Sequence, residues 1–186
     1  MNDIPSGRNT HDSQADGAPA SSAPVASVEG TAPATARVET PRFAVSIEWS
    51  GDASGCGTAR VAGETLAIPI GGAKELGGCG KGANPEELLL AAVGACFAAT
   101  WGIFLKKLGV DHPDPTLRLT SELGKDPQGG FLMTRLTIYA RVPGALLASQ
   151  RTAVEKTLAL AEKYCIISKV AKAAMPVDVV MEEMKG

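Results

Sequence analysis

The chain has 186 residues, of which 45% are hydrophobic, and its formal net charge is −2. This length suffices for one buried core and leaves little room for a second. Because the charge is slightly negative and the basic residues are scattered, nucleic acid is excluded as a partner on electrostatic grounds.

Residues 1–40 are rich in Ala, Ser, Pro, Gly and Thr and contain no aromatic residue. Such a segment cannot offset the entropy lost on ordering, so we expect a disordered tail there and one folded domain over 41–186. The tail has neither the continuous apolar stretch of a secretory signal nor the acid-poor composition of a mitochondrial presequence. We therefore predict a cytoplasmic protein.

The four cysteines fit that compartment, because reducing conditions keep thiols free. Cys56 and Cys79 lie in Gly-rich stretches and are predicted to be surface thiols, with a role for Cys79 left open because it precedes a helix. The sequence has no Cys-x-x-Cys pair and only two histidines. No zinc site and no other metal or cofactor is therefore expected.

The first predicted elements are strands. Residues 43–49 alternate between apolar and polar side chains, with the period of a half-buried strand. Residues 58–61 and 65–70 are predicted to form a hairpin that turns at Ala62 and Gly63, where glycine can supply a positive φ. A Gly-rich loop over 71–82 follows.

A long helix is predicted next. Asn84 can cap it, Pro85 suits its first position, and Lys106, Lys107 and Gly109 form a matching end. The stretch 88–105 carries no charge, which is near the lower limit for crossing a bilayer. Its Ala and Gly content and the lack of an aromatic belt favour a buried central helix that needs cover on all sides.

The remaining chain supplies that cover. Residues 117–122 and 131–142 alternate as strands, 150–174 is an amphipathic helix, and 177–181 is a short closing strand. The order of strands, buried helix, strands, helix and strand predicts an α+β fold with antiparallel sheets.

Two cysteine motifs lie on the two predicted helices. The segment Asn84-Pro85-Glu86 is followed by Cys96 ten positions after the glutamate, and Cys165 lies in a Cys-x-x-Ser segment. The pair resembles the OsmC/Ohr family, the osmotically inducible and organic hydroperoxide resistance proteins, over about residues 43–181. Ile166 stands where members of that family commonly have proline.

The resemblance implies a thiol-dependent peroxidase that reduces organic hydroperoxides in oxidative stress defence. Cys96 would attack the peroxide and form a sulfenic acid, and Cys165 would condense with it to a disulfide. A thiol reductant, for which the resemblance implies a dihydrolipoyl carrier, would reduce that disulfide.

The resemblance also implies an arginine, held by the glutamate at position 86, that lowers the pKa of the attacking thiol. The loop position that carries it in many members is Leu76 here. Arg60 is the predicted substitute, with Lys74 as a further candidate of poorer geometry for a carboxylate.

Glu86 and Cys96 are separated by about 15 Å along one helix. If they share a site, Glu86 must come from a second, antiparallel copy of the helix, which its small residues would allow to approach closely. An intertwined homodimer is therefore predicted, as the family also has. An apolar substrate pocket is expected beside Cys96, and its predicted lining is Leu89, Val93, Phe97 and Trp101.

Two other functions are weighed against the peroxidase. The first is a non-peroxidatic OsmC-like protein that binds a lipid-like or other apolar ligand beside Cys96. The second is a small membrane protein built on residues 88–105, which would leave the charged strands without a core; no membrane association is expected.

Overall fold

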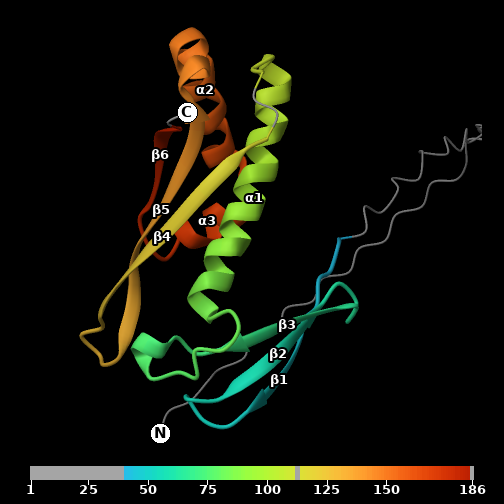
Figure 1. The fold of residues 1–186 in the computed structure, drawn as a ribbon, viewed down its shortest axis with the longest axis vertical. Coiled ribbons are helices and arrows are strands. Elements are labelled where there is room, and N and C mark those ends of the chain that lie inside the picture. The colour runs from blue at the N-terminus through green and yellow to red at the C-terminus, as the bar shows by residue number, and fades with distance from the viewer. Residues whose placement is uncertain (1–39, 112–113, 185–186) are drawn as a thin grey trace, which may run out of the picture. The chain divides into compact units, whose positions relative to one another are not determined.

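The structure is a computed structural model, and it describes residues 40–111 and 114–184 (Figure 1). The disordered tail predicted for 1–40 lies outside the described residues, apart from Thr40. Within them, the chain from Arg42 onward forms one unit that contains two three-stranded sheets and three α-helices. The predicted α+β class is confirmed.

The first sheet is an antiparallel meander of β1 (Ser46–Ser50), β2 (Cys56–Val61) and β3 (Leu66–Gly71). The strand predicted over 43–49 begins three residues later, because its partner β2 ends at Val61, opposite position 45. The predicted turn is confirmed, since Gly63 has a φ of 65°. Antiparallel pairing places Cys56 opposite Gly71.

The central helix α1 (Pro85–Leu108) has the predicted ends. The side chain of Asn84 accepts a 2.7 Å hydrogen bond from the backbone N–H of Glu87, and the Glu87 carboxylate accepts one of 3.1 Å from the backbone N–H of Asn84. This capping box satisfies two N–H groups at the start of the helix. At the other end Gly109 adopts a φ of 66°, which an L residue rarely does.

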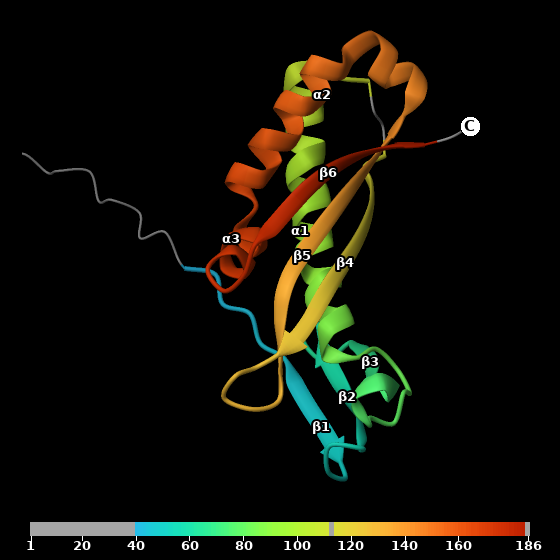
Figure 2. The ribbon, with the colours of Figure 1, turned by 90° about the vertical axis from the view of Figure 1, so that its left-hand side faces the viewer.

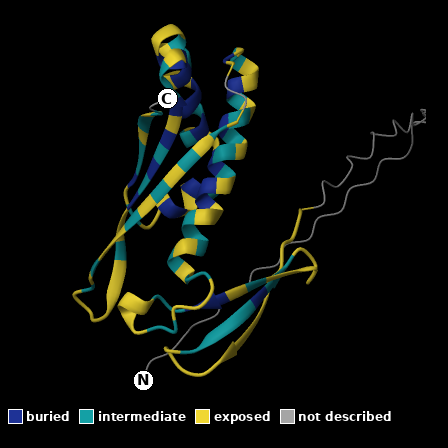
Figure 3. Cartoon of the chain, in the orientation of Figure 1, coloured by how far each residue is buried: buried dark blue, intermediate teal, exposed yellow. Residues whose placement is uncertain are grey.

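Within one chain, α1 is buried on one face only (Figure 3). The buried face consists of Val93, Gly94, Phe97, Trp101 and Leu105. The opposite face is uncharged but exposed, and its residues are Ala91, Ala92, Ala95, Ala99 and Ile103. The sequence predicts that α1 is covered on all sides, but a single chain covers only one of its faces.

The second sheet is formed by β4 (Thr116–Lys125), β5 (Phe131–Pro143) and β6 (Val177–Met184). β4 and β5 correspond to the strands predicted over 117–122 and 131–142 and pair antiparallel as expected, whereas β6 pairs with β5 in parallel. The two strands can be parallel because the crossover through α2 and α3 returns the chain to the end of the sheet at which β5 begins, so β6 runs in the same direction.

The predicted helix over 150–174 is in fact two helices. α2 (Gly144–Tyr164) begins six residues before the predicted start but is kinked at Gln150, where φ is −136°, so its longer part begins where the sequence predicts. α3 (Ile166–Lys172) follows after a break at Cys165, where ψ is 119°. Both helices contact α1, as does β4 (Figure 2). The break therefore lies against the central helix.

Candidate active site

The structure brings Cys96 and Cys165 together. Cys96 is half-buried on α1, and Cys165 is fully buried at the break between α2 and α3. Both are free thiols, and they lie close enough together for each to shift the pKa of the other. The two cysteines of the sequence motif thus form one site, although 69 positions separate them (165 − 96).

The surroundings of Cys96 favour its thiolate. Burial is the largest single cause and raises the pKa of the Cys96 thiol, whereas the backbone N–H of Ile167, the side chain of Cys165 and the backbone N–H of Ile166 lower it. The net result is a pKa below the ordinary value. Donors that point at a sulfur stabilise its charged form more than its neutral form. The Thr100 hydroxyl donates its hydrogen to the backbone oxygen of Cys96, at 2.8 Å.

Cys165 is perturbed in the opposite direction. Burial is the largest cause and raises the pKa of the Cys165 thiol, although the Ser168 side chain and backbone N–H, the latter 3.4 Å from its sulfur, oppose the rise. The neighbouring Cys96 raises the pKa further. A protonated Cys165 can therefore donate to a Cys96 thiolate, and the two thiols are chemically unequal.

Glu86 and Arg60 are not brought to this cysteine pair within one chain. Glu86 lies in the first turn of α1, and its Oε2 atom is buried without a hydrogen-bond partner among the described residues. Arg60 lies on β2 and forms its ion pair across the first sheet with Glu48, with an Nε to Oε1 distance of 3.6 Å. The second basic candidate, Lys74, is exposed at the start of a short 3-10 helix, Lys74–Leu76, within the segment that follows β3.

Glu86 lines a cavity of about 350 Å³, here called the Glu86 pocket. Its walls come from the loop after β3, the start of α1 and the β4–β5 hairpin. The apolar side chains among its lining residues are Ala73, Leu76, Leu90, Leu123 and Phe131. A buried carboxylate oxygen without a partner in largely apolar surroundings is costly.

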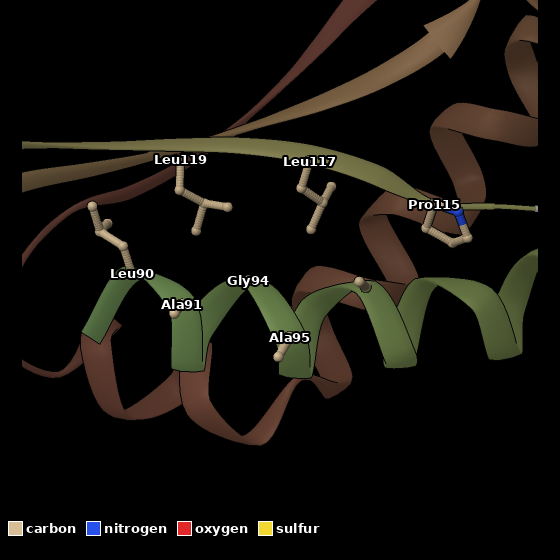
Figure 4. Close-up of a pocket in the computed structure, with 8 residues that line it drawn as sticks. Leu90, Ala91, Gly94, Ala95, Pro115, Leu117 and Leu119 are labelled. Atoms are coloured by element: carbon tan, nitrogen blue, oxygen red, sulfur yellow. The ribbon is translucent and has the colours of Figure 1, made fainter. Parts of the chain in front are cut away.

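The predicted lining of the substrate pocket is wrong for three of its four residues, and the fourth, Leu89, lines neither the Glu86 pocket nor the groove between α1 and β4. Val93, Phe97 and Trp101 are fully buried in the core, because they form the face of α1 that packs against α2 and the second sheet. An apolar groove of about 380 Å³ lies instead between α1 and β4 (Figure 4). It is lined by Leu90, Ala91, Gly94, Ala95, Ala98, Pro115, Leu117 and Leu119, and Cys96 is not among them.

The prediction that Cys56 and Cys79 are free thiols is also wrong, because the structure joins them in a disulfide. The two residues are 23 positions apart in the sequence, which gave no sign of their proximity. The loop after β3 folds back, with hydrogen bonds of 3.1 Å from Gly71 N to Ala83 O and 3.0 Å from Gly80 N to Gly72 O. This return carries Cys79 to the start of β2.

Two further observations concern metals and membranes. Among the described residues, no group of three or more His, Cys, Asp or Glu side chains could hold a metal ion. By length and composition α1 could cross a bilayer, with a mean hydropathy of 2.1 over its most apolar stretch. This is weak evidence, because the central helix of a water-soluble fold has the same properties.

The site therefore combines an α+β fold, a long central helix and two adjacent thiols that differ in pKa. These are the features by which the chain can be compared with known proteins. The OsmC-like protein family matches residues 78–180, which is more than half of the chain. The chain therefore belongs to the OsmC-like protein family. The comparison with curated proteins finds no match.

Solved structures share the fold. An organic hydroperoxide resistance protein OsmC from Legionella pneumophila is 20% identical with a TM-score of 0.63, and the match covers 77% of this chain and 99% of that one. OhrB of Bacillus subtilis, also an organic hydroperoxide resistance protein, is 20% identical with a TM-score of 0.57, covering 75% and 98%. An OsmC-like protein from Mycoplasma pneumoniae is 14% identical with a TM-score of 0.63, covering 79% and 100%.

Proposed function

We propose that the protein is a thiol-dependent peroxidase that reduces organic hydroperoxides with Cys96 and Cys165. The observation that carries this proposal is the contact between two free thiols whose pKa values are displaced in opposite directions. A nucleophilic thiolate beside a protonated thiol is what a two-step peroxide reduction requires. The names of the two organic hydroperoxide resistance proteins with the same fold support the substrate class.

In the first step the Cys96 thiolate attacks one oxygen of the hydroperoxide. The O–O bond breaks, Cys96 becomes a sulfenic acid, and the alkoxide leaves as an alcohol after taking a proton. In the second step the sulfur of Cys165 attacks the sulfur of Cys96, an S–S bond forms, and the sulfenic oxygen leaves as water. A dithiol, such as a dihydrolipoyl carrier, then returns both cysteines to thiols.

The active unit in this proposal is a homodimer. The exposed apolar face of α1 is matched by other unpartnered apolar side chains, including Phe43 at 94% exposure and Ile47 at 63% in and before β1, and Ile166 at 71% and Val170 at 65% on α3. Surfaces of this kind mark an interface. A second copy with its α1 antiparallel would bring its Glu86 toward Cys96 of the first.

In such a dimer Arg60 is the proposed cation for Glu86. The buried Oε2 of Glu86, which has no hydrogen-bond partner within 40–111 and 114–184, supports a cationic partner, and a guanidinium would serve both the carboxylate and the nearby thiolate. We place the protein in the cytoplasm, with the organic hydroperoxide and a thiol reductant as its partners in the reaction and with no cofactor.

A second candidate function is the binding of a lipid-like or other apolar ligand without peroxide chemistry. The groove between α1 and β4 favours it, because all of its lining residues are apolar. Half of the residues that line the Glu86 pocket are apolar as well. Direct measurement of alkyl hydroperoxide consumption by the reduced protein separates the two functions. The Cys96→Ser variant should consume none, and consumption at the wild-type rate by that variant would replace the peroxidase with the ligand-binding function.

A further inference from the structure

The disulfide between Cys56 and Cys79 is a second thiol–disulfide site, separate from the Cys96 and Cys165 pair. It links the first residue of β2 to the middle of the loop 72–83, which connects β3 to α1. We propose that this disulfide is exchanged by dithiols in the folded protein, and that its reduction releases the 72–83 loop from the wall of the Glu86 pocket. The proposal holds whether or not Cys96 reduces peroxides.

The bond lies where the backbone makes room for it. A Cβ atom on Gly71 would clash with Sγ of Cys79 and with the carbonyl oxygen of Lys81, and it would lie 3.4 Å from Sγ of Cys56. Only glycine therefore allows the two sulfurs to meet over the end of β3. Both cysteines are half-buried, which leaves the disulfide within reach of a small thiol.

The two sulfurs differ as leaving groups. The backbone nitrogen of Lys81 lies 3.4 Å from Sγ of Cys79 and donates a hydrogen bond to it, whereas no such donor to Sγ of Cys56 is found among the described residues. A donor stabilises a thiolate, and the better-stabilised thiolate leaves more readily. An incoming thiolate should therefore attack Cys56 and expel Cys79.

The exchange then balances in two steps. The first thiolate of the dithiol bonds to Sγ of Cys56, the S–S bond breaks, and Cys79 leaves as a thiolate held by the N–H of Lys81. The second thiol of the reductant, as its thiolate, attacks the mixed disulfide and releases the Cys56 sulfur. Overall the protein gains two electrons and two protons, and the dithiol becomes a disulfide.

The loop that this bond fastens is part of the pocket. Ala73, Glu75 and Leu76 line the Glu86 pocket from the loop side. After reduction the two ends of the loop keep their backbone hydrogen bonds to β3, including 2.9 Å from Ala83 N to Pro69 O. The middle of the loop loses its covalent link to β2, so this wall becomes free to move.

The proposed cytoplasmic location bears on how stable this disulfide is. In a reducing compartment, protein disulfides are usually transient and take part in catalysis or redox sensing. A reducible disulfide beside a pocket matches that use, because its redox state would follow the ratio of dithiol to disulfide in the surrounding solution.

The first measurement is the identity of the attacked sulfur in the wild-type protein. The folded, oxidised protein is mixed briefly with glutathione, quenched with acid and analysed as tryptic peptides. We expect the glutathione adduct on Cys56 to exceed that on Cys79 roughly tenfold. Equal adducts, an excess on Cys79, or a bond that resists dithiothreitol until the protein unfolds would overturn the proposal.

The second measurement is limited trypsin cleavage after Lys74 and Lys81, which lie on the loop. Cleavage at both should be roughly tenfold faster after reduction, while cleavage after Lys107, at the other end of α1, should not change. The Cys56→Ser/Cys79→Ser double variant should be cut rapidly in both states. Equal cleavage of oxidised and reduced wild type at Lys74 and Lys81 would show that the bond does not hold the loop.

Discussion

Cys165 contacts Cys96 from the break between α2 and α3, and the same contact helps to lower the pKa of Cys96 and to raise that of Cys165. Each thiol thereby favours the opposite protonation state in the other. This coupling assigns the attacking role to Cys96 and the resolving role to Cys165 in the proposed reaction. It also makes that assignment open to test by substitution.

Replacement of Cys165 by serine should separate the two steps. The Cys165→Ser protein should reduce about one equivalent of alkyl hydroperoxide and then stop, because Cys96 has no sulfur with which to condense. Mass spectrometry should find Cys96 as sulfenic acid or its higher oxides. Continued turnover of this variant with dithiothreitol at the wild-type rate would contradict the resolving role of Cys165.

The pH dependence of Cys96 should depend on Cys165. Because the pKa of Cys96 is lowered in the folded protein, its alkylation by iodoacetamide should reach its plateau at a lower pH than that of an ordinary thiol. Cys165→Ala removes one of the donors, so the plateau should move to higher pH. Cys165→Ser keeps a hydroxyl donor and is the matched control. If Cys165→Ala leaves the pH profile of alkylation unchanged, the contact between the two thiols is not a cause of the lowered pKa of Cys96.

Ile166 offers a way to remove one backbone donor alone. It is the first residue of α3, where proline is well tolerated, and Cys165 before it has an extended backbone that suits a following proline. Ile166→Pro deletes the N–H that faces Cys96, so the pKa of Cys96 should rise. Ile166→Val keeps the N–H and should leave the alkylation profile unchanged. If the Ile166→Pro variant has the wild-type pH profile of alkylation, the Ile166 N–H does not contribute to the lowered pKa of Cys96.

The proposed homodimer should depend on the exposed face of α1. Ala95→Glu places a charge at the centre of that face, and burial of an unpaired charge costs about 3 kcal/mol or more, roughly a hundredfold in the dissociation constant. Ala159→Glu, at an exposed alanine of α2, is the control and should not weaken association. Sedimentation of the wild-type chain as a stable monomer at micromolar concentration would refute the dimer.

The basic residue of the site can be assigned from two substitutions. Arg60→Ala should slow the reaction with alkyl hydroperoxide by raising the pKa of Cys96, whereas Lys74→Ala should have a smaller effect. Arg118→Ala, at an exposed ion pair with Glu182, controls for the loss of one charge. The reverse order of effects, or no effect of either, would remove Arg60 from the site.

Local structure, and Cys96 and Cys165 as the candidate attacking and resolving thiols, could be predicted from neighbouring residues and motif spacing. Asn84, Pro85 and Gly109 set the ends of α1 because capping and a positive φ are properties of neighbouring residues. Alternating strands and the uncharged helix predicted the α+β class for the same reason. The motif spacing singled out Cys96 and Cys165, which the structure brings together.

Features that depend on contacts between residues distant in the chain could not be predicted in this way. The helix break at Cys165, which aims the N–H groups of Ile166 and Ile167 at Cys96, forms where α2 and α3 pack against α1. The bond between Cys56 and Cys79 requires the return of the loop beside Gly71. Periodicity shows that α1 is apolar but not which face meets the core, and so Val93, Phe97 and Trp101 are core residues where a pocket lining was predicted. The face of α1 that is buried depends on how the other elements pack against it, and a local sequence pattern does not encode that packing.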